Sequence, residues 1–129
     1  AVLLLPATAP AAVRSEAVLG AQPFSEQKLA DLEREGRPAF VYFTADWCVT
    51  CKVNEKAVLA RDEVAHAFAA RHVAVLVGDW TRGDPGITRF LEKQGRSGVP
   101  LYIYYAPGKP VQVLPQLLTV GTVTGLVQA

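Results

Sequence analysis

The two cysteines of the chain lie three residues apart, in the stretch Trp47-Cys48-Val49-Thr50-Cys51-Lys52. A bridge that closes so short a loop restricts the unfolded chain very little and adds little stability. A pair at this spacing can instead switch between a dithiol and a disulfide, which is the chemistry of thiol:disulfide exchange. The stretch therefore predicts a redox-active pair. A structural disulfide and reversible redox sensing stay open as alternatives.

The residues on either side of the pair predict a buried strand that leads into a helix. Residues 39–44 are apolar without polar alternation, as in a central strand covered on both faces, and residues 50–60 are good helix formers. A cysteine at that junction lies at a helix N-terminus, where unpaired N–H groups favour the thiolate. We therefore expect Cys48 to be the nucleophile. Cys51 lies one turn deeper on the same helical face, and we expect it to be the resolving thiol.

Glu55 is a candidate for the proton acceptor of the pair. It stands four residues after Cys51, on the same face of the predicted helix. A buried carboxylate at this place can take the proton that Cys51 must lose before it attacks. The alternative, a solvated carboxylate paired with Lys52 or Lys56, stays open at this point.

Asp46 and Trp47 immediately precede the pair. The indole of Trp47 offers a flat apolar surface on which a partner peptide can rest. The alternative is that Trp47 only covers the start of the helix, and the two interpretations are compatible.

The rest of the sequence predicts alternating helices and strands. Ser25 can cap a helix that Gly36 ends, and Asp84 followed by Pro85 is a typical helix start. A turn rich in proline and glycine joins the last two strands as a hairpin. The predicted helices cover residues 26–35, 50–60, 63–71, 85–94 and 119–128, and the predicted strands cover residues 39–44, 72–77, 101–105 and 111–114.

With the consecutive helices 50–60 and 63–71 counted as one helical connection, the order is α-β-α-β-α-β-β-α. It predicts an α/β arrangement of a central mixed sheet of about four strands flanked by helices. We expect the first three strands to be parallel and joined by right-handed crossovers. A chain of 129 residues has room for one such domain. We place it at residues 23–129.

Residues 1–22 are predicted to be an apolar tail or linker rich in alanine and proline. The first 13 residues carry no charge but are too short to cross a bilayer, which needs roughly 20 helical residues. They fit the end of a membrane helix or signal segment, and a merely apolar tail is the alternative. Because the sequence contains no methionine, we expect it to be either a processed form or a piece of a longer protein.

Net charge and histidine spacing bear on two other classes of function, nucleic-acid binding and zinc binding. A net charge of +1 gives no electrostatic footprint for nucleic acid, so we expect no nucleic-acid partner. Cys48 and Cys51 followed by His66 and His72 resemble the spacing of a zinc finger. A finger needs a small ββα unit, however, whereas here His66 is expected on a helix surface and His72 at the start of a strand. A zinc-stabilised interaction module is kept only as the alternative from a different class of function.

The block from Ala45 to Lys52, followed by Gly98-Val99-Pro100, resembles a thioredoxin-fold domain, which implies that the α/β arrangement is thioredoxin-like. More narrowly, the sequence is similar to the C-terminal periplasmic domain of DsbD-type thiol:disulfide interchange proteins, including the relatives tied to copper and stress tolerance. The resemblance covers about residues 37–127. It implies that Cys48 attacks, that Cys51 resolves, and that Val99 and Pro100 form a cis-proline loop beside the pair that contacts the bound partner.

The resemblance also implies partners and a location. The electron donor would be a transmembrane relay domain, and the acceptor a periplasmic thioredoxin-like or other disulfide-bearing protein. The domain would be periplasmic and tethered to the inner membrane, and it would need no cofactor besides its own disulfide. A disulfide oxidase or isomerase on the same fold is the alternative. One departure from the family is Tyr42, which stands where its relatives usually have a buried aspartate and is a poor base at neutral pH.

Overall fold

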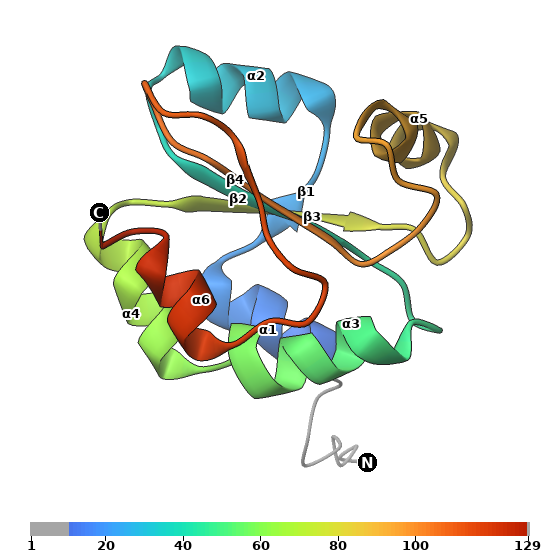
Figure 1. Ribbon diagram of the computed structural model, residues 1–129, viewed down its shortest axis with the longest axis horizontal. Helices are drawn as coiled ribbons and strands as arrows, with labels where there is room; N and C mark the ends of the chain where they lie inside the picture. Colours follow the sequence, from blue (N-terminus) through green and yellow to red (C-terminus); the bar gives the residue numbers. More distant parts are fainter. Residues whose placement is uncertain (1–10, 129) are drawn as a thin grey trace, which may run out of the picture.

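A five-stranded mixed sheet forms the centre of the domain (Figure 1). The computed structural model describes residues 11–128, and side chains from residue 15 onward. The strands lie in the order β1-β3-β2-β4-β5. Their bounds are Gln22–Pro23 (β1), Ala39–Thr44 (β2), Ala74–Asp79 (β3), Leu101–Tyr105 (β4) and Gln112–Val113 (β5).

Helices cover both faces of the sheet, with α2 and α5 on one face and α1, α3, α4 and α6 on the other (Figure 1). The segment η1 is a π-helical continuation of α3. The bounds are Ala11–Leu19 (α1), Glu26–Arg34 (α2), Val49–Asn54 (α3), Glu55–Leu59 (η1), Asp62–Ala70 (α4), Pro85–Lys93 (α5) and Val120–Gly125 (α6).

Strand β2 is buried on both faces, as its unbroken apolar sequence predicts. Phe40 and Tyr42 pack into the core beneath α4 and α6, whereas Val41 and Phe43 pack into the core beneath α2 and α5. This alternation follows from the two-residue period of a strand. The two cores therefore hold β2 from opposite sides and fix the point at which the chain leaves the sheet.

The predicted helix starts at residues 25 and 84 are confirmed. The Ser25 hydroxyl oxygen accepts a hydrogen bond from the Lys28 N–H at 3.0 Å, and Asp84 Oδ1 accepts one from the Ile87 N–H at 3.0 Å. The sequence placed β3 two residues too early. His72 adopts a left-handed φ of 56° after α4, and this turn delays the strand until Ala74.

The folded domain begins earlier than the boundary at residue 23 that the sequence suggested. Residues 11–19 form α1, which packs against η1 and α4, and β1 pairs with β3 through Gln22 and Leu76. A helix this short gains its stability from tertiary packing, which local sequence does not reveal. The suggested membrane segment falls mainly on residues 1–10, outside the described residues. Within residues 11–128, no helix has both the length and the apolar character needed to span a membrane.

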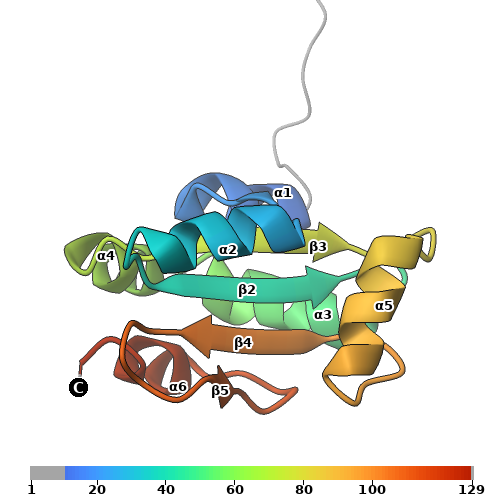
Figure 2. The ribbon, with the colours of Figure 1, turned by 90° about the horizontal axis from the view of Figure 1, so that it is seen from above.

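The direction of β4 also differs from the prediction. β2 and β3 are parallel, but β4 runs antiparallel to β2. Helix α5 lies across the end of the sheet instead of running back along it (Figure 2). The chain therefore enters β4 at the end where it left β3. The mixed α/β class is confirmed, with β1 as a fifth strand.

Gly78 of β3 provides a test of this packing. It pairs with Phe43 across β2 and β3, and a Cβ at Gly78 would lie 2.5 Å from Cδ1 of the Phe43 ring. Because that ring is fully buried, we expect Gly78→Ala to lower the free energy of unfolding by about 1–3 kcal/mol, measured by urea denaturation. Gly121→Ala is the control, since a Cβ there meets nothing within 4 Å. Equal midpoints for both variants would contradict the packing.

Candidate redox site

Cys48 and Cys51 form a disulfide at the junction between β2 and α3. Cys48 is the N-cap residue of α3, and its Sγ accepts a hydrogen bond from the Cys51 N–H at 3.2 Å. Cys48 is 8% exposed, whereas Cys51 is fully buried. Only Cys48 can therefore be reached from outside, and the helix N-terminus faces its sulfur with N–H groups that favour negative charge.

The loop before β4 lies against the disulfide. The peptide bond between Val99 and Pro100 is cis, the geometry that the family resemblance predicts. Val99 packs against the small cluster of Ala45, Cys48 and Cys51, and Pro100 is buried. The predicted contact between this loop and a bound partner stays a prediction.

The surface around Cys48 is apolar and open. Trp47 is 58% exposed, and Val49 and Val53 of α3 are also exposed. Asp46 lies at the edge of this surface, with its Oδ1 4.0 Å from Nζ of Lys52. The structure thus brings Trp47 and Asp46 beside the cysteine pair, as the sequence implied.

Glu55 is fully buried and begins the π-helical segment η1. Its Oε2 accepts a hydrogen bond from the Thr44 hydroxyl at 2.5 Å, and its Oε1 accepts one from Nζ of Lys52 at 3.0 Å. The two sequence alternatives are therefore combined in one arrangement, a buried carboxylate that is also paired with Lys52. No local sequence pattern pointed to Thr44, because the end of β2 and the start of η1 meet only through the fold.

Tyr42 is buried and stacks on Tyr102, with ring centroids 6.2 Å apart. Burial raises the pKa of the Tyr42 phenol far above its ordinary value, although the Ser15 side chain of α1 partly opposes the shift. The phenol stays neutral at physiological pH and cannot replace a carboxylate as a base.

Helix α1 brings a second carboxylate to this region. Glu16 is partly buried, and its pKa is raised first by burial and then by the negative charge of Glu55. Asp79 and Asp46 add to the shift, and Lys52 opposes it. No sequence pattern placed Glu16 near the cysteines, because its position depends on how α1 packs.

Asn54 is a second buried polar residue that the sequence did not single out. Its Nδ2 donates to the Tyr102 hydroxyl at 2.9 Å and to the Gln116 carbonyl at 2.7 Å, and its Oδ1 accepts from the Leu118 N–H at 3.0 Å. Asn54 therefore holds the segment before α6 against the redox helix α3.

The histidines lie apart from this site. His66 is exposed on α4, as expected, and His72 is exposed just before β3. Among residues 11–128 no three or more His, Cys, Asp or Glu side chains are grouped as metal ligands.

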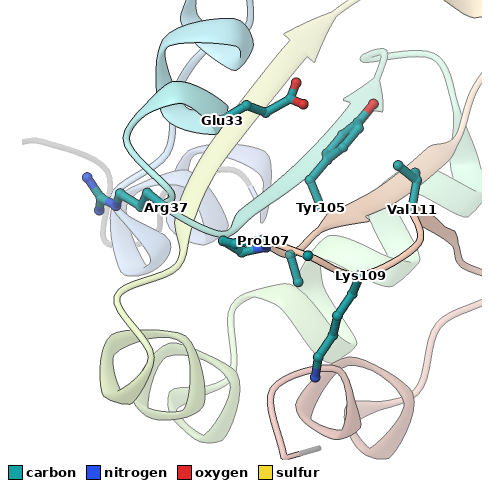
Figure 3. Close-up of a pocket in the computed structure, with 8 residues that line it drawn as sticks. Glu33, Arg37, Tyr105, Pro107, Lys109 and Val111 are labelled. Atoms are coloured by element: carbon teal, nitrogen blue, oxygen red, sulfur yellow. The ribbon is translucent and has the colours of Figure 1, made fainter.

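A pocket at the opposite end of the sheet is lined by Glu33, Arg37, Tyr105 and the turn between β4 and β5 (Figure 3). Burial raises the pKa of Tyr105 to about 12, with a further contribution from Glu33. Tyr105 pairs with Ala39, the first residue of β2, whereas the cysteines follow its last residue. This pocket is therefore separate from the redox site, which is a surface.

Comparison with known proteins now identifies the family. Residues 21–107, more than half of the chain, match the family model described as thioredoxin-like. The chain belongs to the thioredoxin-like family. The redox site is built from three features of this domain. These are the mixed sheet, the cysteine pair at a strand-to-helix junction and the cis Val99–Pro100 bond.

The most similar proteins among those found include DsbD thiol:disulfide interchange proteins. DsbD 1 of Pseudomonas aeruginosa is 32% identical over 80 residues, which is 62% of this chain but 13% of that protein. DsbD of Vibrio vulnificus is 32% identical over 87 residues, 67% of this chain and 14% of that protein. The aligned part thus spans about one seventh of each relative or less.

Solved structures support the fold. The oxidised C-terminal domain of DsbD from Neisseria meningitidis has a TM-score of 0.65 and 22% identity, covering 81% of this chain and 96% of that one. The reduced form of the same domain has a TM-score of 0.62 and 20% identity, covering 81% and 95%. A chloroplastic thioredoxin z has a TM-score of 0.62 and 22% identity, covering 83% and 90%. The chain is therefore a thioredoxin-like domain with a cysteine pair suited to thiol:disulfide exchange.

Proposed function

We propose that this domain relays electrons by dithiol/disulfide exchange from a membrane-embedded donor to periplasmic, disulfide-bearing protein partners. The observation that carries the proposal is the asymmetry of the pair, with Cys48 accessible at the start of α3 and Cys51 fully buried behind it. Similarity to the DsbD proteins supports this donor, these acceptors and a location at the inner membrane. Because the chain aligns with only 13–14% of those proteins, these partners belong to the proposal.

The exchange transfers two electrons between the two cysteine sulfurs of the domain and the two sulfurs of the partner disulfide. In the reduced domain the Cys48 thiolate attacks a partner disulfide, forms a mixed disulfide and releases the first partner sulfur as a thiolate. Cys51 then loses its proton and attacks Sγ of Cys48, which releases the second partner sulfur. The partner gains two electrons and the domain becomes oxidised. The donor dithiol reverses these steps and needs no prosthetic group in the domain.

Glu55 is the proposed proton acceptor for Cys51. It is buried one helical turn after Cys51, and the Thr44 and Lys52 donors fix its two oxygens. Lys52 is partly exposed, so it can exchange between Glu55 and the exposed Asp46 as the proton moves. Trp47, Val49 and Val99 form the proposed contact surface for the partner.

Replacing Cys51 by alanine tests the assigned roles. We expect the reduced Cys51→Ala variant to accumulate a mixed disulfide with insulin through Cys48, because no second thiol remains to release the partner. Non-reducing electrophoresis and peptide mass mapping measure it. The Cys48→Ala variant should form no such adduct, since Cys51 is buried. An adduct only in Cys48→Ala would reverse the roles.

The reduction potential tests the direction of electron flow. A reductant should equilibrate with glutathione or dithiothreitol buffers near the thioredoxin value of about −270 mV. Quantifying reduced and oxidised protein by alkylation measures it. A value near −120 mV, typical of a strong oxidant, would instead support the oxidase or isomerase alternative.

Glu55→Gln tests the proton acceptor. We expect release of the mixed disulfide to slow by about a hundredfold at neutral pH, the usual scale for losing a general base. The deficit should shrink as pH approaches the ordinary thiol pKa of about 8.5, where Cys51 ionises without help. Single-turnover exchange across pH measures this. Glu63→Gln, at an exposed position of α4, is the control, and equal profiles for both variants would exclude Glu55.

A further inference from the structure

The segment after β3 lies beside the turn that carries the cysteine pair, and the register of the two strands explains why. Thr44 pairs with Asp79 where β2 and β3 end, and the Trp80 N–H donates to the Thr44 carbonyl at 2.7 Å. Continuing this parallel register by two residues on each strand brings Thr81 beside Asp46. Neither residue belongs to the sheet, so side-chain contacts must hold the two loops together.

Thr81 makes these contacts with both of its oxygen atoms. Its hydroxyl oxygen accepts a hydrogen bond from the Asp46 N–H at 2.9 Å, and its carbonyl oxygen accepts one from Nε1 of Trp47 at 3.1 Å. The turn that follows is closed by the Cys48 N–H, which donates to the Ala45 carbonyl at 3.1 Å. One residue thus fixes both the backbone and the indole immediately before Cys48.

Asp79 fixes Thr81 in turn. Its Oδ1 accepts hydrogen bonds from the Thr81 N–H at 2.9 Å and from the Thr81 hydroxyl at 2.5 Å. The hydroxyl therefore donates to Asp79 while it accepts from Asp46, which uses its single proton and orients its lone pairs. Valine, which has the same shape, can do neither, and serine can do both.

Trp80 connects this segment to the other side of the site. Its ring lies 6.0 Å from the Trp47 ring, centroid to centroid, and its Nε1 donates to the Thr88 hydroxyl of α5 at 2.8 Å. A Cβ at Gly98 would lie 3.7 Å from the Trp80 ring, so the ring also borders the loop that contains the cis bond. The segment 79–81 therefore touches both loops that flank the disulfide.

We propose that Thr81, held by Asp79, is a positioning residue that fixes the Asp46–Cys48 turn and the Trp47 indole in the orientation to which a protein disulfide binds. The inference rests on the proposed exchange function. It concerns recognition of an extended protein partner, since a small disulfide can reach Cys48 without resting on Trp47. Because the segment 79–81 orders the exposed indole before the partner arrives, less conformational entropy is lost when the partner binds.

The test uses the full chain and two disulfides, insulin and oxidised glutathione. Of the two hydrogen bonds that Thr81→Val removes, the one from the Asp46 N–H holds the turn before Cys48. We expect its loss to raise KM for insulin about fivefold, the scale of a single hydrogen bond, with kcat nearly unchanged. The rate with oxidised glutathione should stay at the wild-type value. Thr81→Ser should restore KM for insulin, because serine keeps the hydroxyl.

A matched control and a double variant complete the design. Thr124→Val removes a hydroxyl that donates to the Val120 carbonyl on α6, and it should leave both rates unchanged. Asp79→Ala combined with Thr81→Val should raise KM no further than Thr81→Val alone, because the two residues act through one contact.

Three results would overturn the inference. These are an unchanged KM for insulin in Thr81→Val, an equal loss with both disulfides, and a failure of Thr81→Ser to restore binding. A wild-type chain that reduces neither disulfide would instead refute the proposed exchange function, and the inference with it. The wild-type measurement thus separates the two failures.

Discussion

Strand β2 is hydrogen-bonded to β3 on one side and to β4 on the other, and all six of its residues are buried. Aromatic side chains on both faces leave the strand no freedom to slide or to rotate. Its last residue, Thr44, therefore has a fixed place, and both the disulfide and the Glu55 carboxylate lie within a few residues or one hydrogen bond of it. Because β3 pairs with β2 in a parallel register, the positions of Asp79 and Thr81 are fixed in the same way. The positions of the redox-site residues are therefore set by the sheet.

The site combines two environments that would conflict if they were not separated by about two helical turns. Cys48 lies at an open apolar surface, whereas Glu55 is buried, and a buried charge costs several kcal/mol unless it is paired and hydrogen-bonded. Thr44 and Lys52 meet that requirement with one donor for each carboxylate oxygen. The neutral phenol of Tyr42 adds no competing charge. The carboxylate can thus remain close to the sulfurs while water is excluded.

Much of this arrangement follows from local sequence. The caps at Ser25 and Asp84, the unbroken apolar run of β2 and the cysteine spacing are all signals carried by neighbouring residues, and each corresponds to its predicted element. What the sequence could not supply depends on distant packing. The antiparallel direction of β4 follows from where α5 lies, and β1 has only two residues, too few for a periodic pattern. The same reason applies to Thr44, Asn54 and Thr81, whose partners lie 11 to 64 residues away.

With α1, the folded domain begins at Ala11, ten residues before the part of the chain that the family model matches. The family match begins at residue 21, yet α1 packs against η1 and places Ser15 beside Tyr42 and Glu16 in the field of Glu55. The residues that the family model matches therefore leave out a helix that packs close to the redox site. A substitution in α1 can therefore change the surroundings of Tyr42 and Glu16 while every residue of the cysteine motif stays the same. Such a helix is a means by which related domains with one motif can diverge in their acid–base behaviour.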